Sequence, residues 1–346
     1  MILQEWWRPD RFALRRGRLD QRGRILGAVR GFFAACGYVE VDTPALQVSP
    51  GLEPHLRAFK TLLHDPHDRT AGRYLHTSPE FAMKKLLVAG MPRIWQLVHV
   101  FRDGERSATH HPEFAMLEWY RVGATYRDLM DECSAMLGTC QHAVGAEAFT
   151  WRGHSADARR PWQRLSVAEA FEKFCGIDLL ATAPDPLAPD VERLAAAARH
   201  LEVAPHPGDD WEAFFFRIFL ERIEPFLGIG TPTILYDYPL SMAALSRRSA
   251  ADPRLAERFE VYVCGIELAN AYGELTDAAE QRRRFVADQA KKQALYGETY
   301  PIDEDFLAAL DCGLPECAGI ALGFDRLVML LTGAEDIEDV LWAPVR

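Results

Sequence analysis

Two arginines stand at the ends of apolar runs, and both are suited to bind phosphate oxygens. Arg102 follows an apolar run and opens a polar loop, while Arg326 lies in the segment GFDRL. A planar guanidinium group can hold two oxygens at once, so Arg102 could bind a phosphate and a carboxylate together. Arg326 could lie on one face of an adenine ring while Phe114 closes the other face. Gly323 would allow a close approach of the backbone to a nucleotide, because it has no Cβ.

Two glutamates, Glu267 and Glu274, are candidate ligands for a hard cation. Mg²⁺ is bound through phosphates and one or two carboxylates, which suits such a pair. Strict alternation along a strand would place residues seven apart on opposite faces. A bulge near Asn270 or Gly273 would bring both carboxylates to one face. The alternative is a pair of solvated glutamates on an edge strand.

The elements that position these residues are predicted from the spacing of apolar side chains. Helices are expected at about 22–36, after a cap signal at Ser78, and at 277–292. Strands are expected at 38–44, 93–102, 113–122, 231–239 and 258–275, and a strand, turn and helix at 319–333. The loop between the second and third of these strands is too long for a tight turn. Strands that follow one another through hairpins predict an α+β fold with an antiparallel sheet flanked by helices.

The domain organisation is predicted to be a single catalytic domain over residues 1–346. A length of 346 residues suggests two domains as a prior, but no internal repeat and no separate domain stands out. Residues 176–210 are rich in alanine and proline. They predict a surface insertion with one helix, either a mobile flap or a plain spacer.

The composition favours a cytoplasmic protein whose main partner is not a nucleic acid. The formal net charge of −11 lacks the electrostatic footprint of a nucleic-acid binder, although a local patch could suffice. An arginine-rich stretch at 8–30 is most simply a solvated helix face. The seven cysteines are an odd number without a CxxC, which predicts reduced thiols. No segment reaches the roughly 18 apolar residues of a membrane span.

Three stretches, taken together and in order, resemble the three motifs of class II aminoacyl-tRNA synthetases. They are VEVDTPAL at 39–46, FRDGERSATHHPEF at 101–114 and GIALGFDRL at 319–327. The intervening segments TSPEFAMKKLL, MLEWY, ILYDYP and FEVYVCGIELANAYGEL resemble the lysyl branch, so the resemblance covers essentially the whole chain. It implies the class II catalytic fold and an enzyme that uses ATP and Mg²⁺ to activate an amino acid as its adenylate.

The resemblance also implies roles for individual residues. Arg102 and Arg326 would be catalytic, and Glu267 and Glu274 would meet the metal. The ATP side would consist of Arg102, Asp103, Gly104, His111, Phe114, Glu267, Leu268, Gly323 and Arg326. The amino-acid side would consist of Ser78, Pro79, Glu80, Glu118, Tyr120, Asn270, Glu274 and Ala321. Three carboxylates around the amino acid suit a lysine with two ammonium groups, because a buried unpaired charge costs several kcal/mol. Glu118 or Glu274 would meet the side-chain ammonium.

The second motif departs from the family pattern FRNE. Asp103 and Gly104 replace its asparagine and glutamate, and Glu105 follows one place later. Either Glu105 or Asp103 could substitute for the missing glutamate, or the activity could be lower. His111 stands where the family usually has asparagine. Arg106 is the only arginine inside the loop and is the candidate for the remaining triphosphate contact.

The start of the chain and Ala321 bear on the acceptor. A full lysyl-tRNA synthetase carries an N-terminal oligonucleotide-binding barrel for the anticodon, which would not fit before the helix predicted at about residue 22. The chain therefore resembles the short paralogues that attach lysine, in the form of (R)-β-lysine, to elongation factor P. Ala321 replaces a common glycine and alters the space near the α-carbon of the substrate. The arginine-rich start could meet an acidic face of elongation factor P, and Pro44 in the first motif implies a homodimer.

Other functions remain open from the sequence. A truncated synthetase would transfer lysine to tRNA, although tRNA is not the expected partner. An amide-forming enzyme related to aspartate–ammonia ligase is disfavoured by the three carboxylates. A non-catalytic regulatory paralogue would fit the altered second motif, but retention of Arg102, Arg326, Glu267 and Glu274 argues against it.

Overall fold

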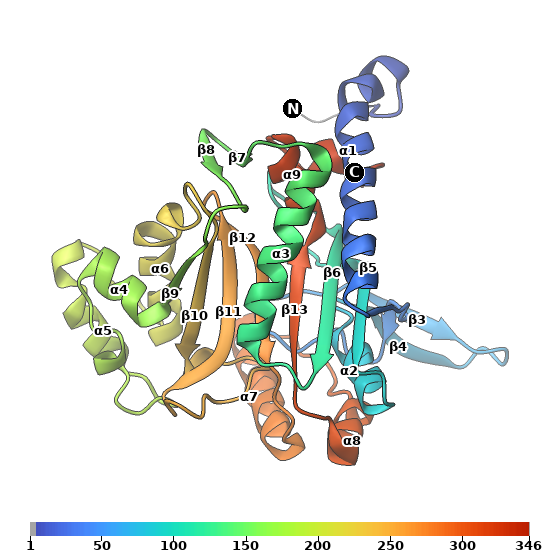
Figure 1. The fold of residues 1–346 in the computed structure, drawn as a ribbon. Helices are drawn as coiled ribbons and strands as arrows, with labels where there is room; N and C mark the ends of the chain where they lie inside the picture. Colours follow the sequence, from blue (N-terminus) through green and yellow to red (C-terminus); the bar gives the residue numbers. More distant parts are fainter. Residues whose placement is uncertain (1–4, 346) are drawn as a thin grey trace. The chain divides into compact units, whose positions relative to one another are not determined.

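The computed structural model describes residues 5–345, and these form two compact units. The first unit comprises the chain up to Ala124, then Thr139–Ala146 and the stretch from Thr276 onwards (Figure 1). The second comprises Thr125–Gly138 and Glu147–Leu275. Helix α3 (Tyr126–Val144) contributes to both. A single catalytic domain over the whole chain therefore stays a prediction.

The first unit contains the sheet that carries the second and third motifs. Strands β5 (Arg93–Phe101) and β6 (Glu113–Val122) form the predicted antiparallel hairpin, and β13 (Cys317–Gly323) pairs antiparallel with β6. The short β1 (Val39–Glu40) pairs parallel with β5. Residues directly opposite each other share a face of a sheet. Antiparallel pairing thus confirms the predicted type of fold in this unit.

One face of this sheet is buried by the first helix, α1 (Pro9–Ala35). The Phe33 ring stacks on Trp95 at a centroid distance of 4.9 Å and meets Trp119 edge-on at 5.3 Å. All three side chains are at most 2 % exposed. Figure 1 shows α1 running beside β5 and β6. Because side chains alternate along a strand, the residues next to Trp95 and Trp119 face the opposite side, where the candidate site lies.

Helix α1 begins at Pro9, well before the start predicted at about residue 22. The idea of a purely solvated arginine face is also wrong for three of its arginines. Arg15 is 2 % exposed and donates from Nη1 to the carbonyl oxygens of Glu338 (2.8 Å) and Leu341 (3.0 Å). Arg18 pairs with Asp339, and Arg22 pairs with Asp325. These arginines bind residues close to the C-terminus. Because of these contacts, a helix rich in polar residues packs against the rest of the first unit.

The other elements of the first unit surround the sheet. They are β2 (Leu46–Gln47), β3 (Lys60–His64), β4 (Thr70–Leu75), α2 (Glu80–Val88), α7 (Ala278–Tyr296), α8 (Glu304–Gly313), α9 (Phe324–Thr332) and the 3₁₀ turn η5 (Ile337–Val340). Helices α2 and α8 meet through stacked rings of Phe81 and Phe306, whose centroids are 4.4 Å apart. Helix α8 was not among the predicted elements.

The second unit contains four neighbouring strands of the large sheet. Strands β10 (Thr233–Pro239), β11 (Leu255–Val263) and β12 (Ile266–Gly273) run antiparallel, and β9 (Gln163–Ser166) pairs parallel with β10. Cys264 and Gly265 join β11 to β12 with positive φ angles of 55° and 75°. Two positive φ angles are typical of a type I′ hairpin turn. The segment predicted as strands at 258–275 is therefore one tight hairpin.

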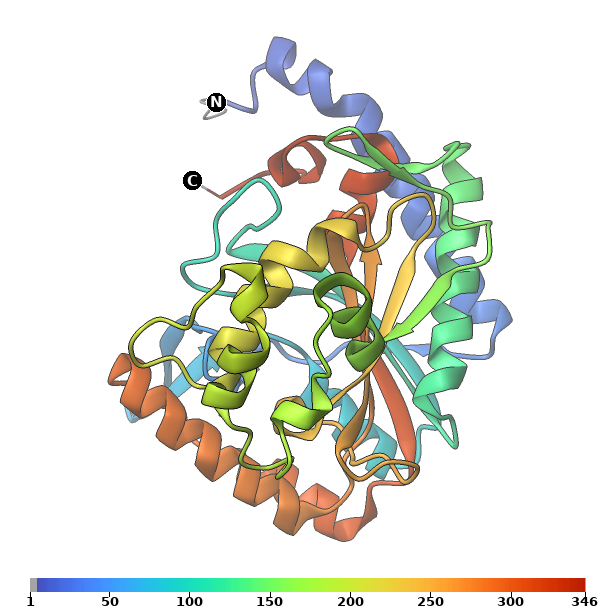
Figure 2. The same ribbon diagram turned by 90° about the vertical axis from the view of Figure 1, so that its left-hand side faces the viewer.

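The insertion at 176–210 is packed into a helical core rather than spread on the surface. It contains one α-helix, as predicted, which is α5 (Val191–Ala197), and the turns η1 (Leu180–Thr182) and η2 (Arg199–Leu201). Leu179 and Leu194 join an apolar cluster with the helices α4 (Val167–Cys175) and α6 (Trp211–Arg222). Figure 2 shows these helices grouped together. These buried leucines anchor the insertion to the neighbouring helices, and the expectation of a flap or spacer stays a prediction.

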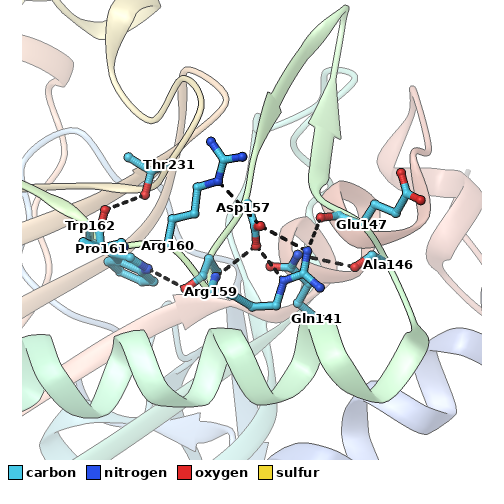
Figure 3. A network of polar contacts seen from close by, with 10 residues as sticks. Gln141, Ala146, Glu147, Asp157, Arg159, Arg160, Pro161, Trp162 and Thr231 are labelled. Carbon is cyan, nitrogen blue, oxygen red and sulfur yellow. Dashed lines mark hydrogen bonds and ion pairs between the residues drawn. The ribbon is translucent and has the colours of Figure 1, made fainter.

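A polar network fixes the segment that leads into β9 (Figure 3). Asp157 accepts two hydrogen bonds from the Arg159 side chain, at 2.8 Å and 3.0 Å, and lies 3.9 Å from Arg160. Thr231 donates to the Pro161 carbonyl at 3.0 Å, just before β10. This loop follows the small hairpin of β7 (Phe149–Trp151) and β8 (His154–Ala156). The network is structural and contains none of the predicted site residues.

Within residues 5–345, no helix is both long enough and apolar enough to cross a bilayer. No disulfide links the seven cysteines in this part of the chain.

His76 makes the stability of the first unit depend on pH. Its side chain is fully buried, Nε2 donates to the His99 carbonyl at 2.8 Å, and burial lowers the pKa of the imidazole. Below pH about 6.5 the unfolded chain then binds more protons than the folded one, so stability falls as pH falls. We expect a loss of up to about 1.4 kcal/mol per pH unit from this residue. Urea unfolding at pH 7.5 and 5.5 should show a smaller loss in His76→Gln, and an equal loss in both proteins would contradict this.

Candidate functional site

A buried carboxylate, Glu118, lies on the open face of the first unit's sheet. It is fully buried, and its two oxygens accept hydrogen bonds from Ser78 (2.6 Å) and Tyr120 (2.9 Å). Across the ladders, Glu118 lies opposite Gln96 on β5 and opposite Ala321 on β13. The structure thus brings together Ser78, Glu118, Tyr120 and Ala321 as the resemblance implied. A methyl group at position 321 lies beside the carboxylate.

Glu80 begins α2 next to this carboxylate, with Pro79 at the N-cap position. Ser78 was predicted to cap this helix. Its hydroxyl accepts a hydrogen bond from the Glu80 backbone N–H at 3.0 Å. The Glu80 carboxylate forms an ion pair with Lys84, whose side chain is 1 % exposed. One of the acidic groups of the pocket is therefore neutralised by the protein itself.

Arg102 lies at the end of β5 with its guanidinium over the ring of Phe114, 5.3 Å from the centroid. Its Nε atom is enclosed, and no residue in the described part of the chain accepts a hydrogen bond from it. The nearest carboxylate is that of Glu105, 4.0 Å away. A guanidinium that lies over an aromatic ring can still bind oxygen ligands through its N–H groups. Phe114 therefore orients Arg102, a contact that the sequence did not suggest.

Asp103 and Gly104 form the turn that follows Arg102. The Asp103 carboxylate lies 3.4 Å from Arg57, and its backbone N–H donates to the Arg57 carbonyl at 2.8 Å. Gly104 has φ +83°, which an L side chain rarely adopts. Of the two acids considered as substitutes for the missing glutamate, Asp103 is thus paired with Arg57. Glu105 is the one beside Arg102.

Arg326 lies in the first turn of α9 and faces the loop of the second motif. Its Nε donates to the Thr109 carbonyl at 3.1 Å, and its Nη2 donates to Nε2 of His110 at 2.7 Å. Burial, and then the charge of Arg326, lower the pKa of His110, so the imidazole is held in the neutral form that accepts this bond. A Cβ at Gly323 would meet only the aliphatic chain of Arg326, at 3.5 Å. This is an ordinary contact distance, so the loop contacts to Thr109 and His110 are what hold Arg326.

The third motif is anchored by Asp325, which was not a predicted site residue. One carboxylate oxygen accepts from the Ala115 backbone N–H at 2.7 Å, and the other binds Arg22 of α1. The side chain is 1 % exposed. Asp325 therefore fixes α9, and with it Arg326, against β6 and the first helix.

His111 and Arg106 bind the C-terminal segment. His111 is 2 % exposed, its Nδ1 donates to the Glu113 carbonyl, and its Nε2 accepts from the Val345 backbone N–H at 3.1 Å. Arg106 donates to Glu338 at 3.0 Å and to the Val345 carbonyl at 3.0 Å. Both side chains hold the loop in place. The triphosphate contact foreseen for Arg106 gains no support from this geometry.

In the second unit, the predicted bulge in the glutamate strand is present. The register shifts so that Val261 lies opposite Ala269 and Tyr262 lies opposite Glu267, which leaves Leu268 as the extra residue. The bulge lies two residues before Asn270, and it reverses the alternation there. Glu267 therefore shares a face with Asn270 and Glu274, as the metal hypothesis requires. Glu274 is fully buried.

Glu260 is a further acidic residue on this face that the sequence did not single out. It lies opposite Asn270, accepts from Arg258 and Tyr262 at 2.6 Å each, and is 3.5 Å from the Asn270 amide nitrogen. Sequence reasoning could have found Glu260 from its position seven residues before Glu267, on the other side of a tight turn. The hairpin brings Glu260 and Glu267 to one face, so both carboxylates can take part in cation binding there.

The described residues contain no cluster of three or more histidine, cysteine or acidic side chains placed to hold a metal by themselves. A Mg²⁺ ion usually keeps several waters and uses only one or two carboxylates together with phosphates. Glu267 and Glu274, with Glu260 as their neighbour, suit such a shared site. The first unit offers the arginines for phosphate and carboxylate oxygens, and a buried carboxylate for an ammonium group.

Comparisons with known proteins agree with this chemistry. The family model of the class II tRNA synthetases for D, K and N matches residues 13–346. Proteins named elongation factor P--(R)-beta-lysine ligase are similar over nearly the whole chain. The one from Vibrio cholerae is 41% identical over 329 residues, 94% of each chain, and the one from Proteus mirabilis is 39% identical over 330 residues, also 94% of each. One from Salmonella dublin is 40% identical over 326 residues, 93% of each chain.

The chain therefore belongs to the class II tRNA synthetase family. Within this family, the chain belongs with the elongation factor P--(R)-beta-lysine ligases, and its class is that of an ATP-dependent ligase. The α+β class predicted from the sequence is confirmed.

Proposed function

We propose that this chain activates (R)-β-lysine with ATP and transfers it to the ε-amine of a lysine on elongation factor P. The observation that carries the proposal is the fully buried Glu118, bonded to Ser78 and Tyr120 and placed opposite Ala321. A carboxylate buried among hydroxyl groups suits a substrate ammonium. The relatives carry the same activity in their names. A test is pyrophosphate exchange, which should depend on (R)-β-lysine and be absent with neutral amino acids.

The reaction needs attack by the substrate carboxylate on the α-phosphate of ATP, with pyrophosphate leaving. Arg102 binds an α-phosphate oxygen and the substrate carboxylate, which orients the two reactants and offsets charge that builds up in the transition state. Arg326 binds the terminal phosphates, with Asp103, Gly104, His111, Phe114, Leu268 and Gly323 lining the nucleotide. Glu267 and Glu274 would hold Mg²⁺, which would supply charge neutralisation at the phosphates. In the second step, the acceptor amine attacks the carbonyl carbon and AMP leaves.

Different acidic groups recognise different parts of the substrate. Glu118 or Glu274 meets the side-chain ammonium, and Ser78, Pro79, Glu80, Tyr120 and Asn270 surround the rest of the amino acid. Neutral side chains could not satisfy two ammonium groups in a buried pocket. The acceptor is elongation factor P rather than tRNA.

Ala321→Gly is expected to shift the preference towards α-lysine by about tenfold in the ratio of kcat/KM values, because a single methyl group in a pocket is worth about that much. The methyl lies on the face of Glu118, opposite it across the β6–β13 ladder. Pyrophosphate exchange with α-lysine and (R)-β-lysine, side by side, measures the ratio. General damage would lower both values together, so an unchanged ratio would contradict the steric role.

A homodimer is part of the proposal. Large apolar side chains of the first unit are exposed near the first motif: Val39, Leu46, Val48, Phe59, Leu62 and Leu63. Exposed apolar groups that gather on short strands are typical of a surface covered by another chain. The occupant proposed is a second copy of this chain.

A further inference from the structure

The segment ILYDYP of β10 resembles the lysyl branch, yet none of its residues has a role in the proposed reaction. The register between β10 and β11 shifts between Tyr236 and Tyr238, and Asp237 at this point has φ +58°. A positive φ is uncommon for a residue other than glycine. Such strain persists only where the surrounding structure holds it, and it is frequent next to functional sites.

Two residues of α3, both in the second unit, hold Asp237 in this conformation. The Tyr126 hydroxyl donates to Oδ1 of Asp237 at 2.6 Å, and Nη2 of Arg127 lies 3.7 Å from Oδ2. The Arg127 guanidinium also lies over the rings of Tyr126 and Tyr236, at 5.2 Å and 5.3 Å from their centroids. Side-chain contacts therefore fix the irregular point of the strand, and with it the place of the next side chain, Tyr238.

Tyr238 lies against a buried arginine of β11. The Arg258 guanidinium lies over the Tyr238 ring, 4.5 Å from its centroid, and Tyr238 is 1 % exposed. The Tyr238 hydroxyl makes no hydrogen bond to any residue between 5 and 345. A cation that is shielded from water is attracted to the face of an aromatic ring, which restricts where the guanidinium can lie. The ring of Tyr238, rather than its hydroxyl, is thus the part that acts on Arg258.

Arg258 in turn binds Glu260. Its Nη2 donates to Oε1 of Glu260 at 2.6 Å, and its Nη1 donates to the Met242 carbonyl at 2.7 Å. The Tyr262 hydroxyl donates to the other carboxylate oxygen, Oε2, at 2.6 Å. Each oxygen of Glu260 thus accepts one short hydrogen bond. Because a carboxylate has about four acceptor positions, Glu260 is oriented without being saturated.

The oriented carboxylate belongs to the group of acidic residues that suits a cation. Glu260 lies opposite Asn270 in the hairpin, and both Glu260 and Glu267 are among the charges that act on Arg258. Residues that orient metal ligands through hydrogen bonds affect the metal affinity although they do not touch the metal. A contact that fixes Arg258 therefore acts on the cation site through Glu260.

We propose that Tyr238 is a positioning residue of the cation site, because its ring holds Arg258 and Arg258 keeps Glu260 oriented for Mg²⁺. This rests on the function proposed above, in which Mg²⁺ binds together with ATP. Tyr238 itself touches neither the metal nor a substrate. The strained backbone of Asp237 is what directs the Tyr238 ring to Arg258.

The test measures ATP binding by calorimetric titration of the full chain, once with Mg²⁺ and once with EDTA. No amino acid is added, so no adenylate forms. In the unmodified protein, Mg²⁺ should strengthen ATP binding. Tyr238→Leu should weaken binding with Mg²⁺ about tenfold, as is typical when a metal ligand loses its orienting partner, and leave binding in EDTA unchanged. Tyr238→Phe should behave like the unmodified protein, because it keeps the ring and loses only a hydroxyl without a hydrogen bond.

The matched control is Phe215→Leu, which removes a ring from the same apolar cluster. Phe215 is fully buried, and its ring stacks on those of Phe171 and Trp211. Tyr238 is part of this cluster as well, so a purely structural role is the alternative to exclude. Phe215→Leu should lower the thermal stability as Tyr238→Leu does, but the effect of Mg²⁺ on ATP binding should stay the same.

Equal weakening with Mg²⁺ and with EDTA in Tyr238→Leu would mean a structural role, as would a loss of the Mg²⁺ effect in Phe215→Leu. Either result overturns the inference. Unchanged binding in Tyr238→Leu, or the same loss in Tyr238→Phe as in Tyr238→Leu, would also overturn it. If the unmodified protein did not bind ATP under either condition, the proposed function itself would fail.

Discussion

Replacing Arg102 by alanine is expected to lower the rate of adenylate formation by about a thousandfold, the loss typical for a cation that stabilises a phosphoryl-transfer transition state. The Arg102 guanidinium lies over the ring of Phe114, and the Glu105 carboxylate lies 4.0 Å from it. A lysine at this position would restore charge but not the two-oxygen geometry. Arg102→Lys should therefore recover only a small part of the lost rate.

Pyrophosphate exchange at saturating ATP and (R)-β-lysine measures this effect on kcat. The matched control is Arg283→Ala, which removes an arginine that is 68% exposed and pairs with Glu280. It should retain the full rate. A decrease of less than tenfold in Arg102→Ala would show that another group binds the α-phosphate and the carboxylate.

Replacing Glu118 by glutamine is expected to remove lysine-dependent activity by a factor of at least about a hundred, because it leaves an ammonium group buried without its counter-charge. The change keeps the shape of the side chain, and one of the bonds from Ser78 and Tyr120 can still form. ATP should bind as before, since Arg102 lies over Phe114 near Glu105, and Arg326 binds Thr109 and His110.

Calorimetric binding of ATP and pyrophosphate exchange with (R)-β-lysine separate these two effects. Glu118→Gln should bind ATP with the affinity of the unmodified protein while its exchange rate falls. Normal exchange would remove Glu118 from the substrate pocket. Loss of ATP binding as well would indicate that the whole site had been disturbed.

The strand pairing of the first unit could be predicted from apolar patterns in the sequence, whereas its candidate site residues came from the family resemblance. The hairpin of β5 and β6 follows from two apolar runs, and its register places Glu118 opposite both Gln96 and Ala321. The bulge at Leu268 was inferred from the need to bring two glutamates to one face, although its position was two residues away. Local patterns were sufficient here because alternation and pairing are local properties.

Long-range contacts could not be predicted. Arg15 and Arg22 look like solvated helix residues, yet they bind carbonyls and a carboxylate that lie more than 300 positions away in the chain. The insertion at 176–210 contributes Leu179 and Leu194 to a core that depends on distant helices. Tertiary packing decided each of these cases.

In the altered second motif, the structure distinguishes two acidic residues that the sequence could not. The sequence left Asp103 and Glu105 as equal substitutes for a missing glutamate. In the structure Asp103 lies 3.4 Å from Arg57, whereas Glu105 lies 4.0 Å from Arg102. We infer that Glu105 takes over the role of the missing residue and that Asp103 stabilises the turn.

The most direct test of the proposed function is transfer of labelled (R)-β-lysine to purified elongation factor P and, in parallel, to lysine tRNA, with ATP and Mg²⁺. Labelled α-lysine serves as the competing substrate. We predict label on elongation factor P, more from (R)-β-lysine than from α-lysine, and none on tRNA. Label on tRNA alone would make the chain a synthetase, and the absence of label on either acceptor, without pyrophosphate exchange, would contradict an active ligase.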